Sequence, residues 1–333
     1  MYTAIRMSFL FLLTVSQLLS FAQPIPVNDE QILLFSSNIT RQGNDVNEFS
    51  AGGKIKQISA VIQNKTIAEV YLIGGQSNAT GQGYLENMTD SMKINKSVMI
   101  FHSGTPHLNS GLPAYNWQPM HQASESPDRF GPELGFASVI KSSLPNSQIA
   151  VIKHAHSGTN LYAEWNPGQN GNDSAHWGFQ FTEFVKTVNA GMDSLRQRGY
   201  EPIVKGMLWQ QGEQEALAVD SISIQYGILL RHFISRVREQ FKAPQMIFVY
   251  GYVCPPPMSS PGIRTVRQAQ HDIDQDSGMS LAVPRAFVIP TDDLSHRAND
   301  KNTKYPKDHL HFGTNGTWVL GWRMGDKINQ YLK

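Results

Sequence analysis

One stretch constrains the fold of this chain more than any other: a short apolar run that leads through glycines to a serine. Residues 70–73 are Val-Tyr-Leu-Ile, and Gly74, Gly75, Gln76 and Ser77 follow directly. An apolar run of this length, bounded by glycines, is typical of a buried strand that ends in a tight turn. In open parallel sheets, reactive groups collect where the chain leaves the carboxyl end of a strand. Ser77 is therefore a candidate nucleophile, provided that the rest of the chain supplies a base.

Further apolar runs alternate with segments of helical periodicity. The runs lie at residues 149–152, 203–209, 246–252 and 286–290. Apolar residues at helical spacing lie at residues 133–140, 181–195, 226–237 and 263–273. Strands that alternate with helices indicate βαβ units and a parallel sheet. The sequence therefore predicts one α/β domain over residues 67–333, in three layers (α/β/α), with a doubly wound, mostly parallel sheet of about five strands.

The start of the chain is predicted to lie outside this fold. Arg6 precedes an apolar segment at residues 7–19, and small residues at positions 20 and 22 are typical of a signal-peptide cleavage site after Ala22. The apolar segment is shorter than the roughly 20 residues of a membrane-spanning helix. We therefore expect residues 1–22 to be a signal peptide and the mature protein to be secreted or periplasmic, without a membrane span. Residues 23–66 form an N-terminal arm for which the sequence predicts no structure.

Charge and cysteine content narrow the possible partners. The 333 residues carry a formal net charge of +1, which argues against nucleic acid as a partner because nucleic acid selects for basic faces. Cys254 is the single cysteine, so no disulfide forms within the chain. Core packing must then hold the fold together, and this length permits a large core.

A candidate base and its orienting acid lie near the end of the chain. Asp308 and His311 are three residues apart, a spacing that can bring the carboxylate against the imidazole. A carboxylate on one ring nitrogen fixes the tautomer and leaves the other nitrogen free to take a proton. His309 lies between the two and competes for the role, but such roles demand specific geometry. Gln210 or Gln211, at the end of the 203–209 run, could donate to an oxyanion without introducing charge.

Four motifs of the chain occur in an order that resembles a known superfamily. They are Gly-Gln-Ser-Asn at 75–78, Phe-Gly-Pro-Glu at 130–133, Trp-x-Gln-Gly-Glu at 209–213 and Asp-x-x-His at 308–311. Together they resemble the SGNH/GDSL hydrolases, and within them the sialate O-acetylesterase-like branch that includes carbohydrate esterase family six. The resemblance covers roughly residues 68–330. It implies a flavodoxin-like, five-stranded SGNH hydrolase fold and a serine esterase that needs neither a metal nor another cofactor.

The resemblance also implies roles for individual residues. Ser77 matches the nucleophile, His311 the base and Asp308 its orienting acid. The oxyanion donors would be the backbone N–H of Ser77, the side chain of Gln211 and a glycine N–H, from Gly131 or alternatively Gly158. Glu213 is expected to tie loops together rather than to act as an acid. Trp165 and Arg129 are expected at the rim that binds the substrate.

The predicted function is that of a secreted serine esterase that removes O-acetyl groups from a carbohydrate through an acyl-enzyme. Acetylxylan and O-acetylated sialic acid are both possible substrates, and a sialic acid would need a cation such as Arg129 to pair its carboxylate. The alternative is a non-catalytic carbohydrate-binding protein whose loop tryptophans stack on sugars. That alternative is less favoured, because a binding module has no need for Ser77, Asp308 and His311 together. A metalloenzyme would use His154 and His156, or His309 and His311, as ligands, but the sequence offers no third group of ligands.

Overall fold

The computed structural model describes residues 65–332. The predicted signal peptide and most of the N-terminal arm lie outside the described residues and stay predictions. Within residues 65–332, no helix is long and apolar enough to cross a membrane.

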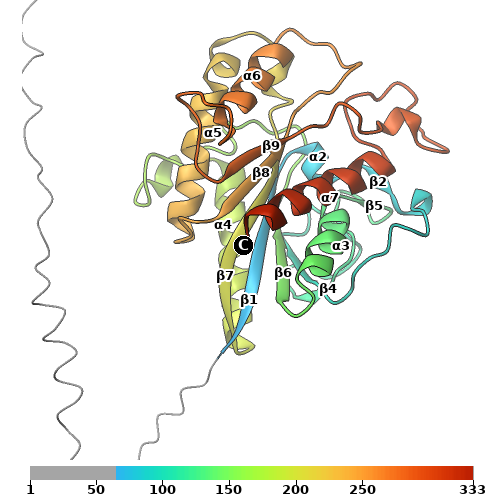
Figure 1. Ribbon diagram of the computed structural model, residues 1–333, viewed down its shortest axis with the longest axis vertical. Helices are drawn as coiled ribbons and strands as arrows, with labels where there is room; N and C mark the ends of the chain where they lie inside the picture. The colour runs from blue at the N-terminus through green and yellow to red at the C-terminus, as the bar shows by residue number, and fades with distance from the viewer. Residues whose placement is uncertain (1–64, 333) are drawn as a thin grey trace, which may run out of the picture. The chain divides into compact units, whose positions relative to one another are not determined.

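A central sheet of seven strands organises the described residues, in the order β4-β3-β6-β1-β7-β8-β9 (Figure 1). The strands are β1 (Thr66–Gly75), β3 (Met99–His102), β4 (Gln118–Pro119), β6 (Gln148–Lys153), β7 (Tyr200–Gln210), β8 (Ile247–Gly251) and β9 (Ala286–Ile289). All neighbours pair in parallel except β3 and β4, which are antiparallel. A separate antiparallel pair joins β2 (Gly83–Tyr84) to β5 (Arg129–Phe130). The predicted α/β class with a mostly parallel sheet is confirmed.

Each of the five strands expected from the sequence is present, as β1, β6, β7, β8 and β9. In chain order their positions across the sheet read 2-1-3-4-5, which is the flavodoxin-like arrangement. The sheet is larger than expected by β3 and β4, which are four and two residues long. Both lie in a stretch rich in glycine, proline and serine, where such short strands leave no periodic signal. Pro119 is tolerated in β4 because an edge strand does not need every N–H.

Helices cover both faces of the sheet (Figure 1). The longer helices are α3 (Glu133–Ser143), α4 (Phe179–Gln197), α5 (Ser221–Gln240), α6 (Ile263–Ile273) and α7 (Thr314–Tyr331). α3 and α7 pack on one face, whereas α4, α5 and α6 cover the other. In β1, Val70 and Leu72 face the core under α4, and Tyr71 and Ile73 face the core under α3 and α7. Both faces of β1 are therefore buried, which explains its unbroken apolar run.

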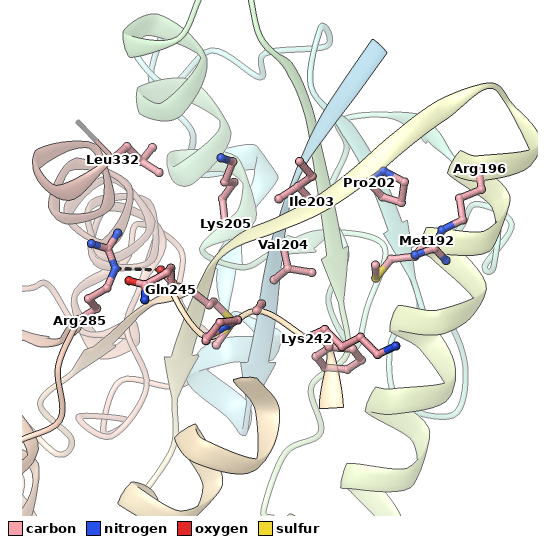
Figure 2. A pocket seen from close by; sticks show the side chains of 14 residues that line it. Met192, Arg196, Pro202, Ile203, Val204, Lys205, Lys242, Gln245, Arg285 and Leu332 are labelled. Atoms are coloured by element: carbon pink, nitrogen blue, oxygen red, sulfur yellow. Dashed lines mark hydrogen bonds between the residues drawn. The ribbon is translucent and has the colours of Figure 1, made fainter. Parts of the chain in front are cut away.

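β7 extends beyond its neighbour β8 at the amino end. β1 pairs with β7 from Tyr200 onward, but β8 joins β7 only from Gly206. The β1–β7 register shifts by one residue at Lys205, which has no β1 partner. A cavity of about 480 Å³ lies beside the part of β7 that does not pair with β8. Figure 2 shows basic side chains around the apolar floor of this cavity. These basic residues are Arg196, Lys205, Lys242 and Arg285.

Candidate active site

The turn after β1 places Ser77 at the centre of the sheet. β1 lies between β6 and β7, where successive connections leave toward opposite edges, and such switch points open crevices at the carboxyl ends of strands. Gly75 makes the turn with a φ of +131°, and a Cβ there would lie 2.1 Å from the carbonyl oxygen of Gln210. Gln76 N donates to that same oxygen at 2.9 Å. Ser77 then begins the single-turn helix α2 (Ser77–Thr80).

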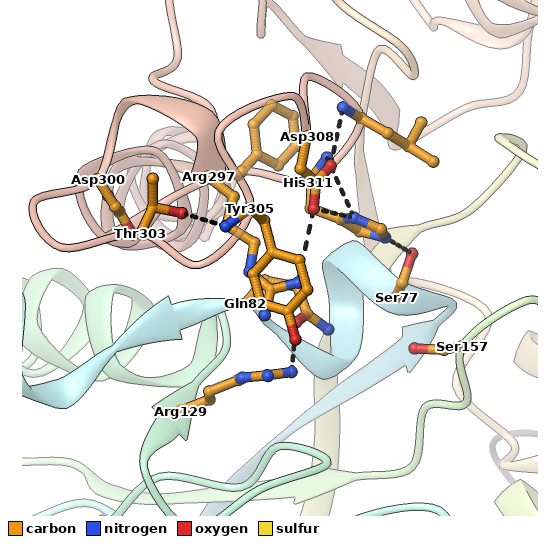
Figure 3. Close-up of polar contacts among 12 residues, drawn as sticks. Ser77, Gln82, Arg129, Ser157, Arg297, Asp300, Thr303, Tyr305, Asp308 and His311 are labelled. Carbon is orange, nitrogen blue, oxygen red and sulfur yellow. Dashed lines mark hydrogen bonds and ion pairs between the residues drawn. The ribbon is translucent and has the colours of Figure 1, made fainter.

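A continuous chain of hydrogen bonds links Ser77 to the loop before α7 (Figure 3). His311 Nε2 lies 3.0 Å from Ser77 Oγ. On the other side of the ring, Nδ1 lies 2.9 Å from Oδ2 and 3.0 Å from Oδ1 of Asp308. Since the Asp308 carboxylate can only accept there, Nδ1 carries the proton and Nε2 is left as a base toward Ser77. The structure thus brings together all three residues that the motifs singled out.

Several donors hold Asp308 in its ionised form. Burial opposes ionisation, but hydrogen bonds from the His311 side chain and from the N–H groups of His311 and Leu310 outweigh it and lower the pKa of Asp308 to about 2. Arg297 Nη1 also lies 3.5 Å from Oδ2. His309, the competing histidine, packs against His296 at a ring-centroid distance of 5.8 Å and does not line the pocket of Ser77.

Asn78, the residue after Ser77, contacts the buried Glu213 under the hydrogen-bonded chain of Ser77, His311 and Asp308. Asn78 Nδ2 donates to Glu213 Oε1 at 2.9 Å, and Gln210 Nε2 lies 3.4 Å from the same oxygen. Burial raises the pKa of Glu213. Glu213 therefore connects the end of β7 to α2, and its expected role in tying loops together stays a prediction. Sequence reasoning gave Asn78 no role, although its place in the Gly-Gln-Ser-Asn motif was a signal.

The amide of Gln211 is engaged within the protein. Its Nε2 lies 2.6 Å from Glu215 Oε2, 3.1 Å from the carbonyl of Thr159 and 3.3 Å from Gln76 Oε1. Tyr226 donates to the Gln211 carbonyl at 2.6 Å and to its Oε1 at 3.2 Å. Because one amide nitrogen has only two hydrogens, these acceptors leave no donor free in this arrangement. The oxyanion role of Gln211 stays a prediction that requires the amide to exchange a partner when substrate binds.

Of the two glycines considered as oxyanion donors, the geometry disfavours Gly131. Its N–H donates to Glu133 Oε1 at 2.8 Å, and its Cα is packed against the turn at Gly81. Gly158, the alternative, lines the same pocket as Ser77, with a φ of +71° and open space where a Cβ would point. Within residues 65–332, neither Ser77 N–H nor Gly158 N–H donates to a protein acceptor. Both are therefore free to bind an oxyanion.

The motif around Gly131 instead builds a buried ion pair under α2. Lys153 Nζ lies 2.6 Å from Glu133 Oε2, and both side chains are fully buried. Lys153 also donates to the carbonyl of Thr80, the last residue of α2, at 2.9 Å. The other carboxylate oxygen, Glu133 Oε1, accepts from the N–H of Ala123 at 3.0 Å. This pair fixes the end of the helix that carries Ser77 against β6 and α3.

The expectation that Trp165 lies at the substrate rim is wrong. Its side chain has no exposed surface and packs edge-on against Trp209 in the core at 5.0 Å. Its Nε1 donates to Thr159 Oγ1 at 2.9 Å, so the ring supports the Ser157–Thr159 loop from below. Trp117 is also buried, so neither of these loop tryptophans offers a ring to a sugar.

The rim of the pocket carries two arginines, Arg129 and Arg297. Figure 3 shows Tyr305 between them, with the Arg297 guanidinium 3.5 Å from the centroid of its ring. Arg129 Nη1 donates to the neutral Gln82 Oε1 at 2.9 Å and, among the described residues, has no acidic partner within 4.0 Å. Arg129 therefore lines the same pocket as Ser77, and its contact with a substrate stays a prediction. The pocket has a volume of about 360 Å³ and also includes Glu125.

A cluster of histidines lies behind the Ser157–Gly158 loop. The ring of His107 lies 4.9 Å from that of His154 and 4.7 Å from that of His156, between centroids. Burial lowers the pKa of His154 to about 3, and burial likewise lowers the pKa of His102, at the end of β3, to about 4. His154 Nδ1 and Nε2 are both hydrogen-bonded within the protein. Within residues 65–332, no three or more His, Cys, Asp or Glu side chains are arranged to hold a metal ion.

Comparison with known families finds one match. A model of the family described as "Carbohydrate esterase, sialic acid-specific acetylesterase" matches residues 67–330. A search of curated proteins found no match.

Solved structures share the fold at low sequence identity. A protein from Arabidopsis thaliana is 19% identical, with a TM-score of 0.59, over 80% of this chain and 99% of that one. NanS is 15% identical, with a TM-score of 0.56, over 80% and 98% of the two chains. A carbohydrate acetylesterase from Xanthomonas citri is 17% identical, with a TM-score of 0.53. That match covers 78% of this chain but 55% of the other, so the chain spans about half of the Xanthomonas protein.

Proposed function

The chain belongs to the carbohydrate esterase family of sialic acid-specific acetylesterases, and from this premise we propose that it removes O-acetyl groups from a sugar through an acyl-enzyme formed on Ser77. The single observation that carries the proposal is the chain of hydrogen bonds from Ser77 Oγ through the His311 ring to Asp308, with contacts of 3.0 and 2.9 Å. A serine hydroxyl is a weak nucleophile until a base within hydrogen-bond reach takes its proton.

In the first half of the reaction, His311 Nε2 takes the proton of Ser77 as Oγ attacks the acetyl carbonyl. The positive charge that forms on the ring lies against the Asp308 carboxylate, which stays ionised because its pKa is about 2. His311 then gives the proton to the sugar oxygen, the bond from this oxygen to the carbonyl carbon breaks, and the acetyl group remains on Ser77. In the second half, His311 takes a proton from the water that attacks the acetyl carbonyl. It then returns the proton to Ser77 Oγ as the bond from Oγ to the carbonyl carbon breaks and acetate leaves.

The negative charge of the tetrahedral intermediate needs fixed donors. We propose the N–H groups of Ser77 and Gly158, because both lack protein acceptors and both residues line the pocket. One such donor is worth about 10²–10³-fold in turnover. Gln211 supports this site through its bond to the carbonyl of Thr159, the residue after Gly158. Gln211 becomes a third oxyanion donor in this proposal when its amide exchanges one of its protein acceptors for the substrate.

For the sugar, we propose a substrate that carries a carboxylate, as an O-acetylated sialic acid does. Arg297 is 5% exposed and is paired with Asp308, whereas Arg129, among the described residues, donates only to a neutral amide. A guanidinium group without an acidic partner favours an anion at the rim, where a carboxylate can accept paired hydrogen bonds. Neutral acetylxylan would leave that charge without a partner.

The deciding test compares acetate release from O-acetylated sialic acids and from acetylxylan, with an aryl acetate as a reference and a long-chain ester as control. Ser77→Ala is expected to lower turnover of every acetyl ester by at least about 10³-fold. Arg129→Ala is expected to lower kcat/KM for the sialic acid and to spare the aryl acetate, whereas Arg129→Lys should retain part of the activity. Full activity of Ser77→Ala would refute the mechanism. A kcat/KM for the sialic acid that is unchanged in Arg129→Ala and lower than that for acetylxylan would leave the neutral sugar as substrate.

The rival function, carbohydrate binding without catalysis, predicts that Ser77→Ala changes nothing that can be measured. Export of the protein is a separate proposal, based on the composition of residues 1–22. Sequencing the amino terminus of the protein recovered outside the cytoplasm tests it, and the expected first residue is the one that follows Ala22.

A further inference from the structure

Asn78 contacts both neighbours of His311 in the chain. Its Oδ1 accepts from the N–H of Phe312 at 3.0 Å, and its Nδ2 lies 3.2 Å from the carbonyl of Leu310. Asn78 is 2% exposed and follows Ser77 directly in α2. The side chain of Asn78, on the helix that carries Ser77, therefore holds the backbone on both sides of His311.

The contacts of Asn78 join two segments that lie far apart in the sequence. Ser77 and His311 are 234 residues apart, and His311 lies in a loop rather than in a helix or strand. The outer side of the loop is tied to residues 295–298, through N–H groups of Arg297 and Gly313 that bond to the carbonyls of His311 and Ser295 at 2.8 and 2.9 Å. Asn78 supplies the tie on the inner side, toward α2. A displacement of about 1 Å between reacting groups is enough to cost about 10²-fold in rate.

Glu213 favours one of the two orientations of the Asn78 amide. Its buried Oε1 accepts from Nδ2 at 2.9 Å, and in a reversed amide the Asn78 oxygen would face this acceptor without a hydrogen between them. Nδ2 therefore points toward Glu213, and Oδ1 accepts from the N–H of Phe312. A carboxylate in place of the amide would face Glu213 with a like charge and could not donate to Leu310.

We propose that Asn78 is a positioning residue that holds His311 within hydrogen-bond distance of Ser77, with Glu213 fixing the orientation of the Asn78 amide. This inference rests on the proposed function, in which Ser77 and His311 carry out the proton transfer. It assigns Asn78 no contact with the substrate. Its loss is therefore expected to lower kcat and to leave KM nearly unchanged.

The first experiment measures kcat and KM of Asn78→Ala on an aryl acetate, together with the rate of inactivation by a fluorophosphonate, which reports how nucleophilic Ser77 is. We expect kcat and the inactivation rate to fall together by about 10²-fold, with KM within about twofold. The matched control is Gln270→Ala. Gln270 is also a buried amide that grips the backbone on both sides of one residue, with contacts of 3.1 Å to Val253 N and to the carbonyl of Gly251. The Gln270→Ala variant is expected to be less stable than the unaltered protein, with little change in kcat.

A second pair of variants keeps the test valid if Asn78→Ala fails to fold. Asn78→Asp is expected to lower kcat at least as far as Asn78→Ala does. Adding Glu213→Gln should then restore kcat roughly tenfold, because a new amide at position 213 can donate to the new carboxylate at position 78. A general loss of stability would give no such recovery.

The outcomes separate the two proposals. If Ser77→Ala is inactive but Asn78→Ala keeps kcat within about threefold of the unaltered protein, the positioning role is overturned and the proposed function stands. An equal fall of kcat in Asn78→Ala and Gln270→Ala, or no recovery in the double variant, also overturns it. Full activity of Ser77→Ala would instead refute the proposed function.

Discussion

Acid is expected to destabilise this protein through two buried histidines, His102 and His154. The side chain of His102 is 1% exposed and that of His154 is fully buried. Burial lowers their pKa values from 6.5 to about 4 and about 3. Positive neighbours add to this effect when they are charged: His121 and Lys153 face His102, and His107 and His156 face His154.

The direction in which folding stability changes with pH depends on whether the folded or the unfolded chain binds more protons. Because both folded pKa values lie below the unfolded value, the unfolded chain binds more protons than the folded one as the pH falls below about 6.5. Folding stability therefore decreases on acidification through this window. At about pH 4.5, two units below the unfolded pKa, each histidine contributes roughly 2–3 kcal/mol of destabilisation, or about 5 kcal/mol together. That is a large share of the roughly 5–15 kcal/mol by which proteins of this kind are stable.

Urea denaturation between about pH 7.5 and pH 4.5 measures this effect in the unaltered protein and in His154→Gln. The variant should start less stable at neutral pH, because it alters hydrogen bonds to Ser103 and Gln180. Its free energy of unfolding should then fall by roughly 2–3 kcal/mol less than that of the unaltered protein as the pH is lowered. His271→Gln is the matched control, since that side chain is 49% exposed. If His154→Gln and the unaltered protein lose the same free energy on acidification, burial of His154 is not the cause and the reasoning fails.

Three further perturbations follow from the site. Lys153→Met should cost about 3–5 kcal/mol in the free energy of unfolding, since it leaves Glu133 buried without its cation; a loss under about 1 kcal/mol in urea denaturation would contradict this. Gly75→Ala should abolish esterase activity or folding, because its Cβ would lie 2.1 Å from Gln210 O; near-normal kcat with a native circular dichroism spectrum would disprove it. Dialysis against EDTA should leave aryl acetate hydrolysis unchanged, because the proposed steps use only side chains and water; a loss that added metal reverses would argue otherwise.

Much of the fold could be read from the sequence because the strands that build its centre are buried on both faces. β1, β6, β7, β8 and β9 all contain apolar runs, and helices with clear periodicity separate most of them. β3 and β4 depend on pairing rather than on their own composition. β3 is held by β6, and β4 is held only by two residues of β3. Such strands exist because a neighbour is present, so a local pattern cannot predict them.

The candidate site also contains some residues that local motifs predict and others that depend on distant contacts. Ser77, Asp308 and His311 could be identified because each stands in a short motif whose chemistry is recognisable on its own. Trp165 was misplaced because its position in a polar loop suggested exposure, whereas Trp209 and Thr159 bury it. The sequence favours Gly131 over Gly158 because Gly131 stands in the Phe-Gly-Pro-Glu motif. In the structure, Glu133 of that motif forms the ion pair with Lys153. Distant contacts of this kind leave no trace in the local sequence.

The early start of β7 relative to β8 leaves part of a central strand without a neighbour on the β8 side among residues 65–332 (Figure 2). Such an edge is a template on which a strand of another molecule can add, and repeated addition leads to aggregates. Here Pro202 contributes no N–H, Glu201 and Lys205 place charges along the edge, and the register shift at Lys205 twists it. Copies of the protein that meet at this edge would find charged side chains and a bent strand. Such features let the chain keep a long strand at the centre of its sheet with less risk of polymerisation.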